Sequence, residues 1–114
     1  MQTRAATRNL ANELYKEAGP GSEEPGPNEW RRGSRRRGIQ VPVDIRIGSD
    51  EICGHVRNAG PDSLCVVVRQ RLRAGLAVMV RRAYADGAEW SAMRVVHCTD
   101  TVGGSKVGLV ADNR

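Results

Sequence analysis

Hydrophobic and polar residues alternate along residues 39–47, a pattern typical of a β-strand with one buried face. Further apolar runs, bounded by glycine, proline and aspartate, predict strands over residues 52–56, 64–68, 76–84, 89–97 and 106–110. Asp86-Gly87 predicts a hairpin between the fourth and fifth of the six strands. Short antiparallel strands at regular spacing predict an all-β fold, a small antiparallel six-stranded β-barrel in which closure removes exposed edges.

Before the strands, apolar residues recur at steps of three and four, which predicts an N-terminal amphipathic α-helix over residues 3–18. Gly19-Pro20 ends it, and proline and glycine predict a flexible linker over residues 19–30. The predicted organisation is a helix (1–18), a linker (19–30) and a barrel domain (31–114). The helix is expected to dock on the barrel, on a partner or on a second copy, which would give a homodimer.

Basic residues gather just before the first long strand, where five arginines lie within residues 31–37 of a chain with a formal net charge of +5. The planar guanidinium of arginine matches a phosphate or the edge of guanine through two parallel hydrogen bonds. The run therefore predicts an anionic partner, with a solvated basic linker as the alternative. Glu23 and Glu24 are expected to be solvated, the alternative being that they fold back onto the arginines.

Several function classes are disfavoured by the composition. Phenylalanine is absent, with only two tryptophans and two tyrosines, which argues against a sheet that binds RNA by stacking bases. No apolar run reaches the roughly 20 residues of a membrane span, and no secretory signal is visible, so a soluble cytoplasmic protein is expected. No catalytic spacing is visible, so we expect a binding protein that is not an enzyme and has no cofactor.

The cysteines and histidines do not predict a metal site. His97 and Cys98 are neighbours on one strand and should point to opposite faces, so they cannot join Cys53 around one zinc ion. A hairpin through residues 58–63 would set Cys65 opposite about Val56, which excludes a disulfide to Cys53. Free buried thiols are the expected state.

Four features follow one another in an order that carries a resemblance. They are an R-x-x-x-R motif at Arg32 and Arg36, a Pro42-Val43 step in the first strand, a short polar loop at residues 58–63, and a closing Gly-Gly-x-x-Val-Gly-Leu at residues 103–109. In this order and spacing the chain resembles a PilZ domain, the bacterial receptor module for cyclic di-GMP. The resemblance covers about residues 31–110.

The resemblance implies a ligand site. Arg32 and Arg36 would clamp the phosphates and guanine edges of cyclic di-GMP, with Arg31 as an additional contact. The family's second motif, (D/N)-x-S-x-x-G, falls on residues 58–63, so Asn58 would read a guanine edge. This chain has glycine at the motif's third position and serine at its sixth, so the hydroxyl would come from the other end of the loop. The remaining residues assigned to the site are Gly60, Ser63 and Gly108.

The implied function is that of a cyclic di-GMP receptor or adaptor in second-messenger signalling. Nucleotide binding would protect residues 30–38 from amide exchange, shift the N-terminal helix and act on a downstream protein partner. Two alternatives stay open. One is a PilZ-like protein-interaction module that does not bind nucleotide, and the other is nucleic-acid binding without sequence preference.

Overall fold

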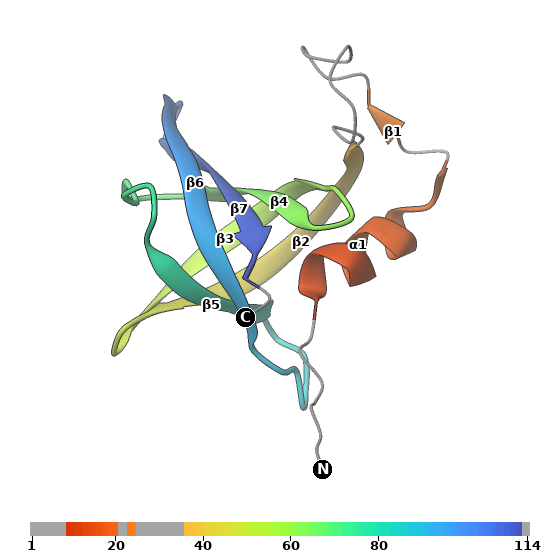
Figure 1. Cartoon of the computed structure of the whole chain (residues 1–114), viewed down its shortest axis with the longest axis horizontal. Helices are drawn as coiled ribbons and strands as arrows, with labels where there is room; N and C mark the ends of the chain where they lie inside the picture. Colours follow the sequence, from red (N-terminus) through yellow and green to blue (C-terminus); the bar gives the residue numbers. More distant parts are fainter. Residues whose placement is uncertain (1–8, 21–22, 25–35, 113–114) are drawn as a thin grey trace.

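The computed structural model describes residues 9–20, 23–24 and 36–112, and its main body is a closed antiparallel β-barrel (Figure 1). Neighbouring barrel strands follow the order β2-β3-β4-β7-β6-β5, and β5 pairs with β2 to close the barrel. The predicted fold class is therefore confirmed. The six barrel strands are β2 (Arg36–Ile47), β3 (Asp50–Ala59), β4 (Ser63–Val68), β5 (Ala77–Arg82), β6 (Ser91–Thr101) and β7 (Gly104–Ala111).

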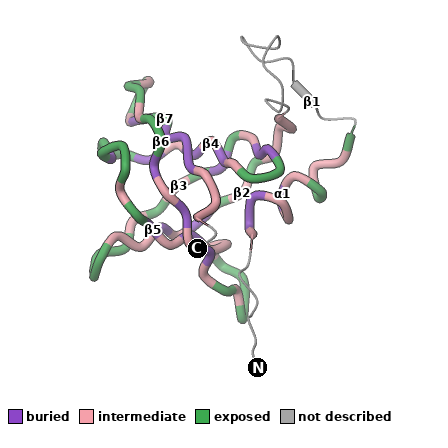
Figure 2. The backbone as a smooth tube through the Cα atoms, in the orientation of Figure 1, coloured by how far each residue is buried: buried purple, intermediate pink, exposed green. Residues whose placement is uncertain are grey.

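Aliphatic side chains fill the barrel interior, because every second residue of each strand points inward. Ile45, Val66 and Leu109 come from three different strands and are fully buried. The packing leaves no spare volume at Gly54, where an added Cβ would lie 2.8 Å from Cγ1 of Val66. Figure 2 shows buried residues along the barrel strands and in α1, with exposed residues at the hairpin tips.

The helix α1 (Leu10–Ala18) lies against one end of the barrel (Figure 1). Asn9 caps it, its side-chain oxygen accepting a hydrogen bond from the backbone N–H of Asn12 at 3.1 Å. Leu10, Ala11 and Leu14 are buried in the barrel core. The apolar face of the helix therefore docks on the barrel of its own chain, which is one of the partners expected for it. The homodimer stays a prediction. The first residues of the predicted helix, 3–8, lie outside the described residues.

The hairpin predicted at Asp86-Gly87 is confirmed, since β5 pairs antiparallel with β6 and the backbone N–H of Ala88 donates a hydrogen bond to the oxygen of Ala85 at 3.3 Å, but its strands are shorter than expected. β5 ends at Arg82 and β6 begins at Ser91, so the connection spans residues 83–90. The indole of Trp90 explains the difference, because it packs against the guanidinium groups of Arg46 and Arg81 instead of continuing β6. Tyr84, expected at the end of a strand, takes a left-handed conformation with φ of 61°.

A short strand lies inside the predicted linker. β1 (Glu23–Glu24) pairs antiparallel with the start of β2, with Glu23 opposite Arg37 and Glu24 opposite Arg36. At the level of the backbone, this segment folds back onto the end of the arginine run. Among the described residues, no helix is both long and apolar enough to cross a membrane.

Candidate functional site

Three irregularities interrupt the barrel's ladders, and all three border one line of residues that crosses the sheet. The register shifts lie between Gly38 and Val41, between Val56 and Asn58, and between Val95 and His97. A β-bulge re-aims the side chains beside it, and bulges are enriched next to functional sites. Three of them at one level of the barrel therefore mark this level as the candidate site.

The pairing register connects these positions into a continuous line. Gly38 lies opposite Asn58, Asn58 opposite Cys65, Cys65 opposite Gly108, and Gly108 opposite His97. We call these five residues the outer-face row. With strands about 4.8 Å apart, the line from the first residue to the last spans about 19 Å.

The burial pattern fixes which side of the sheet the row occupies. Cys65 lies between the buried residues Leu64 and Val66, and Gly108 lies between Val107 and Leu109, which are also buried. Side chains alternate along a strand, so the row faces out of the barrel. His97 is exposed while Cys98 packs against the core, as predicted.

Asn58 has an unusual environment for an amide side chain on this face. Its Oδ1 atom is buried and accepts no hydrogen bond in the described part of the chain. A buried acceptor without a partner costs about 1–3 kcal/mol. The N1–H and N2–H groups of a guanine base are donors of the kind that this oxygen lacks.

His97 and Gly108 fit together at the other end of the row. A Cβ added to Gly108 would lie 2.4 Å from Nε2, 2.6 Å from Cε1 and 2.9 Å from Cδ2 of the His97 ring. The far edge of the imidazole thus fills the place of a side chain on β7. Any residue larger than glycine would push the ring away.

Two neighbouring arginines at the start of β2 are used differently. Arg37 Nη1 donates a hydrogen bond to the backbone oxygen of Tyr15 at 3.0 Å, and its guanidinium carbon lies 3.8 Å from the centre of the Tyr15 ring. Arg37 therefore joins β2 to α1. Since alternate residues face opposite sides, Arg36 lies on the face of the outer-face row, two residues from Gly38.

Arg31 and Arg32, the other predicted clamp residues, lie outside the described residues. Ser63 shares the outer face with Cys65, two residues further along β4. Gly60 is buried in the β3–β4 turn, where its N–H donates a hydrogen bond to the Ser63 oxygen at 2.8 Å. The structure therefore brings four of the predicted site residues onto one face of the sheet, namely Arg36, Asn58, Ser63 and Gly108. Gly60 instead makes a hydrogen bond within the turn.

The prediction that Cys65 lies opposite Val56 is wrong, because Cys65 pairs with Asn58 and Val56 pairs with Val66. β3 continues to Ala59 and β4 begins at Ser63, so the turn is residues 60–62 and not the loop 58–63 expected from the sequence, and this sets Asn58 opposite Cys65. The three cysteines are free thiols, but the prediction that they are buried is wrong, because Cys53 is exposed and Cys65 and Cys98 are half-buried. Within residues 9–20, 23–24 and 36–112, no group of three or more His, Cys, Asp and Glu side chains is arranged to hold a metal ion.

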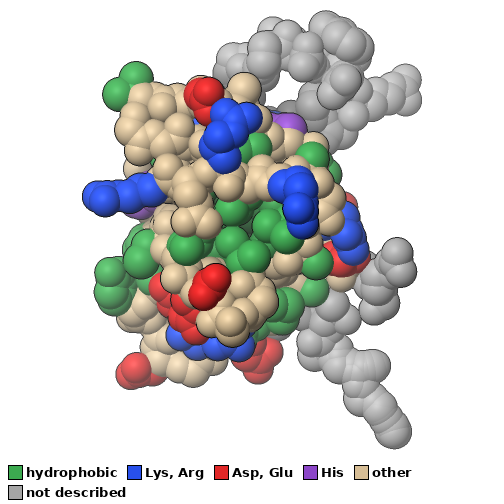
Figure 3. All heavy atoms as spheres, turned by 90° about the vertical axis from the view of Figure 1, so that its left-hand side faces the viewer, with side chains coloured by type: hydrophobic (Ala, Val, Ile, Leu, Met, Phe, Trp, Pro, Cys, Tyr) green, Lys and Arg blue, Asp and Glu red, His purple; other side chains and the backbone are tan. Residues whose placement is uncertain are grey.

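Two pockets lie elsewhere in the described part of the barrel. One pocket of about 390 Å³ lies beside the β5–β6 connection, and another of about 460 Å³ is lined by Ile52, Cys53, Arg69 and Gln70. Neither includes a residue of the outer-face row. Figure 3 shows one side of the barrel, where hydrophobic side chains gather centrally and acidic groups lie among the basic ones. The described residues on that side do not form the continuous basic surface typical of proteins that bind nucleic acid without sequence preference.

Sequence reasoning missed three members of the outer-face row. The sequence motifs assign no role to Gly38. They indicate Cys65 only as a free thiol and His97 only as a candidate metal ligand. One signal was present, because Gly108 interrupts an apolar strand without a turn, which marks the close approach of another group. The identity of that group depends on the β6–β7 register.

Comparison with protein-family models gives no match for this chain, and comparison with curated proteins gives none. The resemblance to PilZ domains therefore rests on the residues and motifs of the chain itself.

Proposed function

We propose that this protein is a receptor for cyclic di-GMP and that the nucleotide lies on the outer face of the barrel, across the outer-face row. Arg36 binds a phosphate or a guanine edge from the start of β2. Asn58 accepts a hydrogen bond from the Watson–Crick edge of a guanine. Arg32, four residues before Arg36, completes the clamp from the preceding segment.

The observation that carries the proposal is the coincidence of three bulges with a buried, unpartnered Asn58 oxygen. The bulges break the regular hydrogen-bonding pattern of the sheet at one level. The unpartnered acceptor has a reason to exist if a ligand supplies the missing donor. Arg36 and Asn58 lie on the same face of the sheet, and a ligand that contacts both must uncover the buried oxygen of Asn58.

Calorimetric titration with cyclic di-GMP tests the proposal. The wild type should bind and Arg36→Ala should bind about 10- to 100-fold more weakly, since a hydrogen bond to a charged group contributes roughly 1.5–3 kcal/mol. Arg73→Ala is the matched control, because Arg73 is exposed in the β4–β5 connection and its loss changes the net charge equally. That variant should bind like the wild type.

Each other outcome identifies one of the alternatives. If the wild type gives no heat with cyclic di-GMP, the receptor function is wrong and a protein-interaction module takes its place. If Arg36→Ala and Arg73→Ala weaken binding equally, the attraction is a general effect of net charge. In that case affinity for single-stranded DNA should fall steeply as salt is raised, as expected of contacts to phosphates alone.

A further inference from the structure

We propose that His97 provides the surface on which a base of the bound nucleotide stacks, and that Gly108 serves to seat its ring. This assignment rests on the proposed function and adds a residue that determines affinity at the far end of the site. It also gives Gly108 a role through His97 in place of direct contact with the ligand.

The position of His97 follows from the β6 bulge. Val95 faces the core, whereas both Val96 and His97 are exposed, so the extra residue turns His97 outward at the level of the row. Across the strand boundary, the ring edge fills the space above Gly108. The imidazole thus lies over the sheet surface instead of extending into solvent.

A flat ring on a sheet surface is suited to stacking against a purine. Histidine is among the side chains on which proteins stack unpaired bases, and such stacking does not require a particular hydrogen-bonding edge. The chain has few aromatic residues, and the histidine therefore supplies a π-surface on the outer-face row, which otherwise has none.

The spacing of the row fits a ligand with two bases. Three strand boundaries separate Asn58 from His97, a path of about 14 Å along the curved surface of the barrel. A single base cannot contact both residues. A dinucleotide can place one guanine at Asn58 and the other at His97, with Cys65 and Gly108 forming the low floor between them.

A double-mutant cycle with calorimetric titration of cyclic di-GMP tests this inference. His97→Ala should weaken binding by about 5- to 100-fold, the usual effect of removing a stacked ring. Gly108→Ala should weaken binding comparably, because its methyl group displaces the imidazole. In the His97→Ala background, Gly108→Ala should have no further effect beyond about twofold, because the space is then empty.

Two variants sharpen the cycle. His97→Phe keeps a flat ring without a nitrogen donor and should bind within about threefold of the wild type if stacking is the contact. His55→Ala is the control, since His55 is an exposed histidine on the same outer face, 3.0 Å from Gln40 and outside the row. It should bind as the wild type does.

Thermal unfolding of each variant shows whether it is folded. Each binding result that differs from the expected one overturns a defined part of the inference. If His97→Ala binds with wild-type affinity while Arg36→Ala still binds more weakly, the role of His97 is overturned and the receptor function stands. An undiminished effect of Gly108→Ala without the histidine shows that Gly108 itself contacts the ligand. Loss of binding in His97→Phe overturns stacking, and no binding by the wild type overturns the receptor function together with this inference.

Discussion

At the scale of single residues, Asn58 combines a cost in stability with a proposed role in binding. Its buried Oδ1 has no partner in the described chain, and such an atom costs about 1–3 kcal/mol. Replacing Asn58 with alanine removes the unpaired acceptor. We expect Asn58→Ala to raise the melting temperature of the ligand-free protein by about 4–8 °C, corresponding to a gain of about 1 kcal/mol.

The same change should weaken cyclic di-GMP binding by about two- to tenfold, as expected for the loss of a neutral hydrogen bond. Opposite signs for stability and affinity are typical of a residue kept for its function. Thermal unfolding and titration on one sample measure both quantities. A variant that is destabilised and binds normally would show that Asn58 serves the fold.

Residues of the site differed in how far the sequence could reveal them. Arg36 and Asn58 stand in local motifs, so their assignment needed no knowledge of the fold. His97 has no such motif, and its place follows from the pairing of β6 with β7 and from a bulge. A bulge depends on how two strands twist against each other, which residue spacing within one strand does not encode.

At the scale of elements, α1 is an integral part of the hydrophobic core. Leu14 is fully buried between the helix and the barrel. Leu14→Ala should therefore lower the free energy of unfolding by about 2–5 kcal/mol, as large-to-small changes in cores do. The control is Lys16→Ala on the exposed face of the same helix, which should change it by less than about 0.5 kcal/mol.

Denaturant unfolding measures the free energy of unfolding of both variants. Amide exchange of residues 10–18 shows whether the helix itself is loosened. A loss below about 1 kcal/mol for Leu14→Ala would mean that the helix leaves the barrel in solution. Its apolar face would then be available for a second copy of the chain. Dimerisation through the helix predicts the same result together with a molecular mass that rises with concentration.

The strands could be predicted because their interior positions repeat every second residue, most clearly in residues 39–47. The ends of the strands were harder to predict from the sequence. β2 begins at Arg36 and β3 continues to Ala59, where polar residues and bulges hide the alternation. The pairing of β4 with β7 and of β5 with β2 joins distant segments, and one hydrophobic pattern fits several strand orders.

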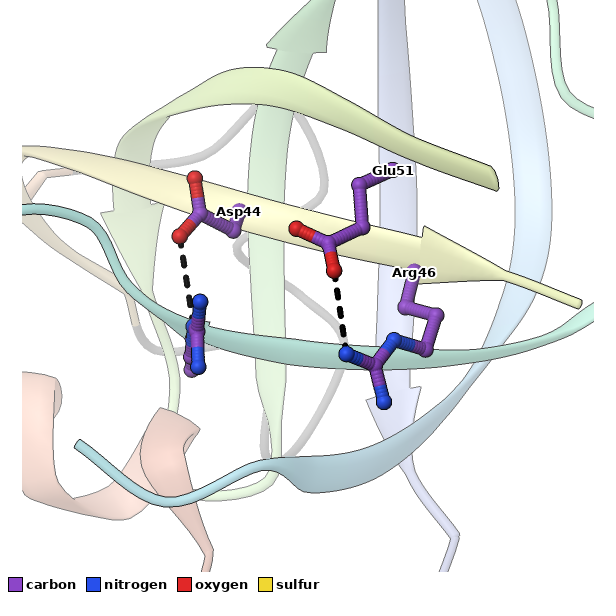
Figure 4. Close-up of polar contacts among 4 residues, drawn as sticks. Asp44, Arg46 and Glu51 are labelled. Carbon is purple, nitrogen blue, oxygen red and sulfur yellow. Dashed lines mark hydrogen bonds and ion pairs between the residues drawn. The ribbon is translucent and has the colours of Figure 1, made fainter. Parts of the chain in front are cut away.

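At the scale of the whole molecule, the barrel depends on one seam. β5 closes onto β2 through four residue pairs, from Val43 opposite Arg82 to Arg46 opposite Met79. On the outer surface, Asp44 of β2 forms an ion pair across the seam with Arg81 of β5 at 3.2 Å (Figure 4). Beside it, Arg46 of β2 forms an ion pair with Glu51 of β3 at 2.9 Å. These groups are partly exposed, so the ion pairs alone add little.

Trp90 adds stability to the seam that the ion pairs do not supply. The guanidinium carbons of Arg46 and Arg81 each lie 4.3 Å from the centre of its ring, so the indole contacts two cations. Each contact contributes about 0.5–1 kcal/mol near a surface, and the buried part of the indole adds a hydrophobic term. The clamp ties the β5–β6 connection to both strands of the seam.

We therefore expect Trp90→Ala to lower the free energy of unfolding by about 2 kcal/mol or more and the melting temperature by roughly 10 °C. Val102→Ala, at a fully exposed valine, is the control and should leave both unchanged. β5 contributes no residue to the outer-face row, so cyclic di-GMP should bind folded Trp90→Ala with wild-type affinity. Thermal unfolding and titration well below the melting temperature measure the two effects separately. Weakened binding by the folded variant would show instead that the seam and the outer-face row form one coupled unit.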